Sequence, residues 1–167
     1  MTGRTLVAGV GNIFQRDDAF GVEVIRLLDD RPRPSGAKIA DFGIRGVHLV
    51  YELLDGWDLF VLVDVAQLGR TPGTVTVIEV EPTDMASPSG VMDAHGLAPD
   101  QVFAMLDALG SRPKRCLVVA CEPADVSAGM GLSDEVRAAL PHAVRTVEKI
   151  LEQIQPEEGA DTDVHAD

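Results

Sequence analysis

Five carboxylates share a position at or just beyond the carboxyl end of an expected β-strand: Asp17, Asp18, Asp41, Asp64 and Glu122. In an open α/β sheet, the carboxyl ends of the parallel strands meet at one edge, where ligands bind. We therefore expect these carboxylates to converge there. Because close carboxylates repel one another, such a cluster requires raised pKa values or a bound cation.

His95, in the segment DAHG after the apolar run 74–80, could join the acidic residues from a loop. Carboxylates with one imidazole suit a divalent metal such as zinc or nickel, which polarises a carbonyl or activates water. Each residue also has a structural alternative: a helix N-cap for Asp17 or Asp18, and a surface position for His95. Asp64 lies within the apolar run LFVLVDV, where hydrogen bonds or a cation must satisfy its carboxylate.

Other chemistries have less support in the sequence. Gly9 and Gly11 suggest a dinucleotide fingerprint, but Phe14 replaces its third glycine and two aspartates stand where phosphates would bind. No serine lies in a G-x-S-x-G motif. Cys116 and Cys121 are an odd number of positions apart on one expected strand, so they should face opposite sides as buried apolar residues.

Composition narrows the class of protein. The 167 residues carry a formal charge of −13 with 46% hydrophobic residues, which disfavours nucleic-acid and anionic membrane partners. Two cysteines and a short apolar N-terminal stretch indicate a cytoplasmic chain without disulfides or a signal peptide. We expect one domain over residues 1–154, an acidic disordered tail over 155–167, and a monomer.

The elements that must position these residues alternate between apolar runs and amphipathic stretches. The expected strands are 5–10, 38–41, 59–65, 74–80 and 114–121, and the expected helices are 20–28, 43–54, 99–109 and a final one capped by Ser133. The connection between 59–65 and 74–80 is too short for a parallel crossover, which predicts that these two strands pair antiparallel. The fold class is therefore α/β: a three-layer α/β/α sandwich with a five-stranded, mostly parallel twisted sheet and one antiparallel strand.

Several motifs taken together resemble the hydrogenase maturation proteases, endopeptidases that trim the large subunit of nickel-iron hydrogenases. They are GVGNIFQRDDAFGVEV at 9–24, DFGIRG at 41–46, LFVLVD at 59–64, PGTV at 72–75 and DAHGL at 93–97. The resemblance covers roughly residues 4–154. The combination of these motifs is specific, although each motif alone is not.

The resemblance implies that Asp18, Asp64 and His95 are the metal-binding and catalytic residues. Family members carry Glu or Asp at the first of these positions, and the Asp18 side chain is the shorter of the two. The chain also departs from its relatives after Asp41, where many have a Gly-Thr pair but this sequence has Gly43 to Gly46. Arg45 in that segment could pair with Asp41 or with a substrate carboxylate, or simply lie on the surface.

The implied activity is removal of the C-terminal extension from the precursor of the nickel-iron hydrogenase large subunit. Nickel already inserted in the precursor would be the recognition feature, so the free enzyme would hold none. Either the metal polarises the scissile carbonyl, or it positions the substrate while an aspartate acts as general base. The alternatives are another metal-dependent hydrolase with permanently bound zinc, and a nickel escort or checkpoint protein without peptidase activity.

Overall fold

The computed structural model describes residues 3–80, 106–110 and 112–154. Its elements follow the order β1 (Thr5–Val10), a 3-10 turn η1 (Arg16–Ala19), α1 (Phe20–Asp29), β2 (Ala37–Gly43), α2 (Gly46–Leu53), β3 (Leu59–Val65), β4 (Val75–Val80), β5 (Arg115–Cys121) and α4 (Asp134–Ile154). These bounds agree closely with the predicted strands and with three of the predicted helices. The fourth, 99–109, lies mostly outside the described residues, and so does the predicted tail 155–167.

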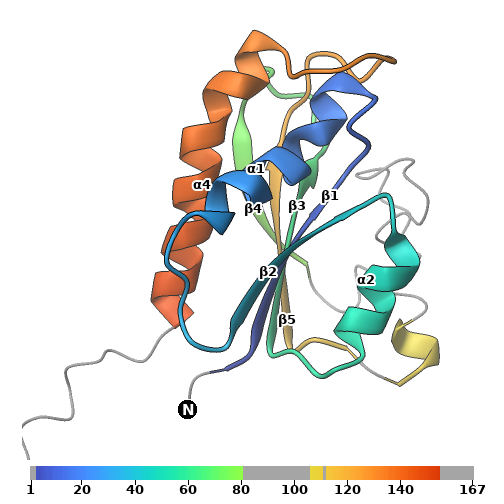
Figure 1. Ribbon diagram of the computed structural model, residues 1–167, viewed down its shortest axis with the longest axis vertical. Coiled ribbons are helices and arrows are strands. Elements are labelled where there is room, and N and C mark those ends of the chain that lie inside the picture. The colour runs from blue at the N-terminus through green and yellow to red at the C-terminus, as the bar shows by residue number, and fades with distance from the viewer. Residues whose placement is uncertain (1–2, 81–105, 111, 155–167) are drawn as a thin grey trace, which may run out of the picture.

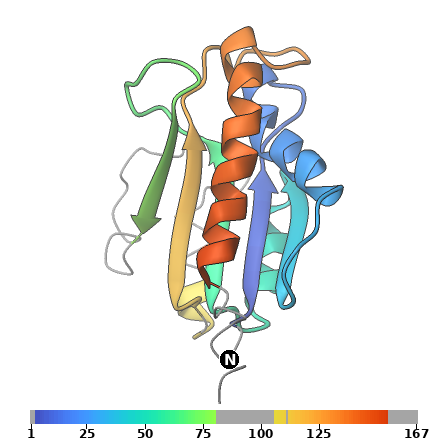
Figure 2. The ribbon, with the colours of Figure 1, turned by 90° about the vertical axis from the view of Figure 1, so that its left-hand side faces the viewer.

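The five strands form one sheet in the order β2-β1-β3-β5-β4. β1 pairs in parallel with β2 and β3, and β3 pairs in parallel with β5. β4 is the antiparallel strand and lies at an edge of the sheet, next to β5 (Figure 2). The predicted α/β sheet with one antiparallel strand is confirmed.

β4 runs antiparallel to β3, as predicted, but the two strands are not hydrogen-bonded neighbours, because β5 lies between them. The chain between β3 and β4 passes over the end of β5 and is held there by hydrogen bonds. Ala66 donates its backbone N–H to the carbonyl of Cys121 at 3.0 Å, and Gly73 donates to the carbonyl of Glu122 at 2.8 Å. A short connection therefore spans one intervening strand, and its length alone could not reveal that strand.

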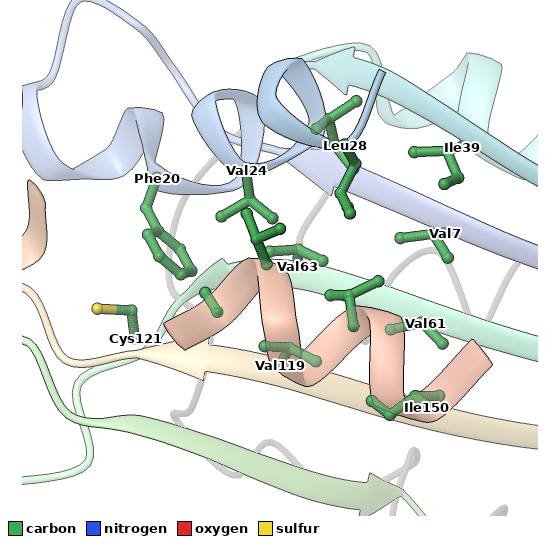
Figure 3. Packing of buried hydrophobic residues seen from close by; sticks show 14 of the residues in the cluster. Val7, Phe20, Val24, Leu28, Ile39, Val61, Val63, Val119, Cys121 and Ile150 are labelled. Atoms are coloured by element: carbon green, nitrogen blue, oxygen red, sulfur yellow. The ribbon is translucent and has the colours of Figure 1, made fainter. Parts of the chain in front are cut away.

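Helices cover both faces of the sheet, which gives the three predicted layers (Figure 1). α1 and α4 lie on one face and α2 lies on the other. Figure 3 shows the core under α1 and α4, where Phe20 and Val24 meet Val63 and Val119 of the central strands. All seven residues of β3 are buried, because this strand is central and covered on both faces.

Candidate active site

Asp18 and Asp64 are the two predicted metal ligands that the structure describes, and both are buried at the carboxyl edge of the parallel strands. Asp18 lies in η1 after β1 with no exposed surface, and Asp64 lies near the end of β3 with 4% exposure. The backbone N–H of Asn12 donates to Asp18 Oδ2 at 2.6 Å, and the N–H of Val65 donates to Asp64 Oδ1 at 2.7 Å. These bonds hold the two carboxylates in place.

The electrostatic environment of Asp64 is unfavourable for a bare carboxylate. Burial raises the pKa of Asp64 well above its ordinary value, and the negative charge of Asp18 raises this pKa further. The hydrogen bond from Val65 N–H opposes the shift. Two buried carboxylates that repel each other in this way could both bind a divalent cation, which would compensate their charges.

Close backbone packing brings Asp18 to this edge. Gly11 has φ +141°, and a Cβ atom there would lie 1.8 Å from the carbonyl oxygen of Asp18. A Cβ on Gly21 at the start of α1 would lie 2.2 Å from the carbonyl oxygen of Val63 in β3. Glycines of the motif 9–24 therefore allow close contact between chain segments, which explains their presence without a bound dinucleotide.

Asp17 has a different role from Asp18, although the two are adjacent and equally buried. Its carboxylate accepts hydrogen bonds from the backbone N–H groups of Ala124, Asp125 and Ser133 and from the Ser133 hydroxyl. Neither aspartate caps its own helix, because η1 and α1 both lack a side-chain cap bond. The N-cap alternative is therefore wrong, whereas Ser133 does cap α4 through the N–H of Val136 at 3.4 Å, as predicted.

The remaining acidic residues of the predicted cluster each accept hydrogen bonds from backbone N–H groups. Glu122 is buried and accepts hydrogen bonds from the N–H groups of Leu68 and Arg70 in the β3–β4 connection. Asp41 is exposed and accepts a hydrogen bond from the N–H of Gly43 at 2.8 Å. Arg45 is exposed, as in the surface alternative, and donates to the backbone carbonyls of Asp41 and Phe42 instead of pairing with the Asp41 carboxylate.

The third predicted ligand, His95, lies outside the described residues. Within 3–80, 106–110 and 112–154, no group of three or more His, Cys, Asp or Glu side chains is arranged to hold a metal ion. Of the three predicted ligands, the described residues therefore include only the two carboxylates, Asp18 and Asp64.

The two cysteines are free thiols on opposite faces of β5, as the spacing predicts. Cys121 belongs to the core under α1 and α4, and Cys116 belongs to the core under α2. Burial raises the pKa of each thiol to about 12. Neither is therefore suited to act as a nucleophile in the folded protein.

The sequence did not predict the exposed apolar side chains on segments at the carboxyl edge of the sheet. Phe14 is 61% exposed in the β1–η1 loop, Ile44 is 57% exposed after β2, and Met130 is 68% exposed in the β5–α4 connection. All three segments follow carboxyl ends of parallel strands, where Asp18 and Asp64 lie. Single exposed apolar residues are common in folded proteins. Composition therefore cannot indicate that these three lie on segments at the same edge of the sheet.

Two buried carboxylates at the carboxyl edge of the sheet, one in η1 and one near the end of β3, define the class as an α/β protein with a candidate metal-dependent hydrolase site. The family model for hydrogenase maturation proteases matches residues 22–150, a range that includes Asp64 and His95. The chain belongs to the hydrogenase maturation protease family, a family of endopeptidases. Among the described residues, no helix combines the length and apolar character needed to cross a membrane.

Individual relatives agree with this assignment. The chain is 31% identical over 149 residues to the hydrogenase expression/formation protein HupM of Azotobacter chroococcum, covering 86% of this chain and 71% of that protein. It is 32% identical to the coenzyme F420 hydrogenase subunit delta of Methanothermobacter thermautotrophicus, covering 85% and 90% respectively. The hydrogenase maturating endopeptidase HybD from Escherichia coli has a similar structure, with a TM-score of 0.78, 28% identity and coverage of 90% and 93%.

Proposed function

We propose that this chain removes the C-terminal extension from the precursor of a nickel-iron hydrogenase large subunit, and that nickel already present in the precursor directs the cleavage. Family membership supports the endopeptidase activity and the type of substrate. The observation that carries the role of nickel is the pair of buried carboxylates, Asp18 and Asp64.

The proposed ligands are Asp18, Asp64 and His95. Carboxylate and imidazole groups both bind nickel, and the burial and the repulsion from Asp18 that raise the pKa of Asp64 favour the arrival of a cation. The nickel belongs to the substrate, so the free enzyme has no need of a resident metal. Binding would require Asp64 to release its proton, which makes recognition of the metal dependent on pH.

In this proposal, Asp18 and Asp64 complete the coordination of the nickel in the precursor and hold the neighbouring peptide bond in the site. The hydrogen bonds from Asn12 and Val65 preorganise the two carboxylates. Water then attacks the scissile amide, and we propose no nucleophile from the chain itself. The buried cysteines, with pKa values raised to about 12, agree with this choice.

The exposed apolar residues suit a folded or extended polypeptide substrate. Phe14, Ile44 and Met130 offer apolar contacts on segments that leave the same edge of the sheet as the two carboxylates. Burying such side chains against a partner would contribute binding energy beyond the metal contacts. A substrate of protein size could use these contacts, whereas a free metal ion could not.

The proposal is tested by incubating a hydrogenase large-subunit precursor with this protein and measuring the intact mass of the precursor. We expect loss of a C-terminal peptide from the nickel-loaded precursor and no change in the nickel-free precursor. Cleavage of both forms would overturn the role of nickel but keep the peptidase. A cognate nickel-loaded precursor that binds and stays intact would favour the escort alternative, and bound zinc in the purified chain would favour a permanently metallated hydrolase.

A further inference from the structure

Asp17 is a fully buried carboxylate whose hydrogen bonds all connect η1 to a distant part of the chain. Asp17 Oδ2 accepts from the N–H groups of Ala124 at 2.8 Å and Asp125 at 2.9 Å, and from the Ser133 hydroxyl at 2.9 Å. Asp17 Oδ1 accepts from the Ser133 N–H at 2.7 Å. One side chain therefore binds both the segment after β5 and Ser133, the residue that caps α4.

The backbone around Asp17 is connected to the same segment. Asp17 donates its N–H to the carbonyl of Asp125 at 3.0 Å, and Arg16 donates to the carbonyl of Gly129 at 3.1 Å. Gly129 in turn donates to the carbonyl of Phe14 at 2.9 Å. A Cβ atom on Gly129 would lie 2.7 Å from the guanidinium of Arg16, so the two segments are in close contact.

Asp18 is held from the other direction. Its Oδ2 accepts the N–H of Asn12 at 2.6 Å, and its carbonyl oxygen packs against Gly11. The 3-10 turn η1 is therefore fixed on one side through Asp17 and on the other through Asp18. Because the two residues share one peptide unit, a rotation of the turn at Asp17 also moves the Asp18 carboxylate.

We propose that Asp17 is a positioning residue, which sets the orientation of η1 and so keeps the Asp18 carboxylate directed to the site that it shares with Asp64. This inference rests on the proposed function, because it assigns Asp17 a role in the nickel-directed cleavage. Residues that hold metal ligands in place commonly change metal affinity or activity by roughly 10- to 100-fold when they are replaced.

The four donors explain why this position needs a carboxylate. All four hydrogen-bond donors point to the two oxygens of Asp17, and a carboxylate offers acceptor sites on both. An asparagine at this position would present one acceptor oxygen, and its NH₂ group would face an N–H donor. Asp17→Asn therefore keeps the size of the side chain while leaving at least one buried donor without an acceptor.

The test compares Asp17→Asn with Val147→Ala. Val147 is fully buried in α4 and packs in the core under α1 and α4, so its truncation lowers stability and leaves every Asp17 bond in place. Two quantities are measured: kcat and KM for cleavage of the nickel-loaded precursor, and hydrogen exchange of the Asn12 amide. The exchange rate reports the Asn12 bond to the Asp18 carboxylate in the full chain without any metal.

For Asp17→Asn, we expect kcat to fall by roughly 10- to 100-fold and the Asn12 amide to exchange faster, together with the amides of Ala124 and Asp125. We expect Val147→Ala to lower the Tm while keeping the kcat and the Asn12 exchange of the native protein. Faster exchange at Ala124 and Asp125 with unchanged kcat and Asn12 exchange would overturn the proposal, because Asp17 would then only fasten the segment after β5.

Ser133→Ala provides a milder second variant if Asp17→Asn does not fold. It removes one of the four donors and keeps the Ser133 backbone N–H, so we expect a smaller fall in kcat with faster Asn12 exchange. Native values for both would overturn the proposal. Failure of the proposed function is distinguishable, since the native protein would then leave the nickel-loaded precursor intact whatever the exchange data show.

Discussion

The buried carboxylates of Asp18 and Asp64 come from different segments, and burial, together with the charge on Asp18, raises the pKa of Asp64. Two like charges in a water-excluded place lower the stability of a folded chain unless a cation compensates them. The core of the fold does not need this arrangement, because apolar residues of β1, β3 and β5 fill it. The pair therefore supports the proposed binding of a metal.

Asp64→Asn should stabilise the free protein at neutral pH and abolish cleavage. The folded-state pKa of Asp64 is raised above 3.8, so between 3.8 and that raised value the unfolded chain loses a proton that the folded chain keeps. This residue therefore lowers stability increasingly as pH rises through that window, and by a constant amount above it. We expect a gain in unfolding free energy of about 1–3 kcal/mol at pH 8.

The measurement is urea denaturation of both proteins at pH 4.5 and pH 8. The gain from Asp64→Asn should be larger at pH 8 than at pH 4.5, because the destabilisation caused by the raised pKa grows as pH rises from 3.8 toward that raised value. A gain that is larger at pH 4.5 would show that the pKa of Asp64 is not raised.

Gly11→Ala should destabilise the protein and prevent cleavage. The added Cβ would lie 1.8 Å from the Asp18 carbonyl oxygen, and the backbone at φ +141° disfavours any side chain. We expect a loss of about 3 kcal/mol or more in unfolding free energy, because the backbone around Asp18 must move.

Gly56→Ala is the matched control for Gly11→Ala. Gly56 also has a positive φ, +84°, but nothing lies within 4 Å of its added Cβ. We expect a loss of about 1–2 kcal/mol from backbone strain and native cleavage activity. Equal losses of stability and activity in the two variants would contradict the close approach of Gly11 to Asp18.

Glu122→Gln should loosen the connection between β3 and β4. The Glu122 carboxylate accepts the N–H groups of Leu68 and Arg70, the latter at 2.6 Å, and a glutamine would replace one acceptor with a donor. We expect a loss of about 1–3 kcal/mol in unfolding free energy and faster hydrogen exchange at these two amides. Unchanged exchange at Leu68 and Arg70 would contradict the assigned contacts.

The thiols of Cys116 and Cys121 should resist modification in the native protein. Both are buried, and burial raises each pKa to about 12, so the reactive thiolate is scarce at pH 8. We expect an aromatic disulfide reagent to label neither thiol under native conditions. It should label both thiols in about 6 M guanidinium, which is well above the usual unfolding midpoint. Native labelling accompanied by loss of cleavage would indicate a cysteine in the active site.

Much of the fold could be predicted from local patterns, because buried strands such as β3 are continuous apolar runs and α4 has a clear apolar stripe. The strand that pairs with β4 could not be predicted from such patterns. Strand order depends on contacts between distant segments, and here the Glu122 carboxylate and backbone hold the crossing connection over β5.

The places of the buried carboxylates could be predicted to a similar extent. Asp18 and Asp64 were identifiable because carboxylates at strand ends converge, but the same rule selected Asp17, Asp41 and Glu122. Their separate roles depend on which backbone N–H groups meet each carboxylate in space, such as Ala124 with Asp17. No local pattern near Asp17 contains that information.

In the proposed mechanism, Asp18, Asp64 and His95 together hold the nickel of the precursor during cleavage. The decisive measurement is intact-mass analysis of nickel-loaded precursor after incubation with Asp18→Ala, Asp64→Ala and His95→Ala, each confirmed as folded by circular dichroism. We predict that the native protein releases the C-terminal peptide and that all three variants leave the precursor uncut. Full cleavage by the folded Asp64→Ala variant would contradict this assignment of the site.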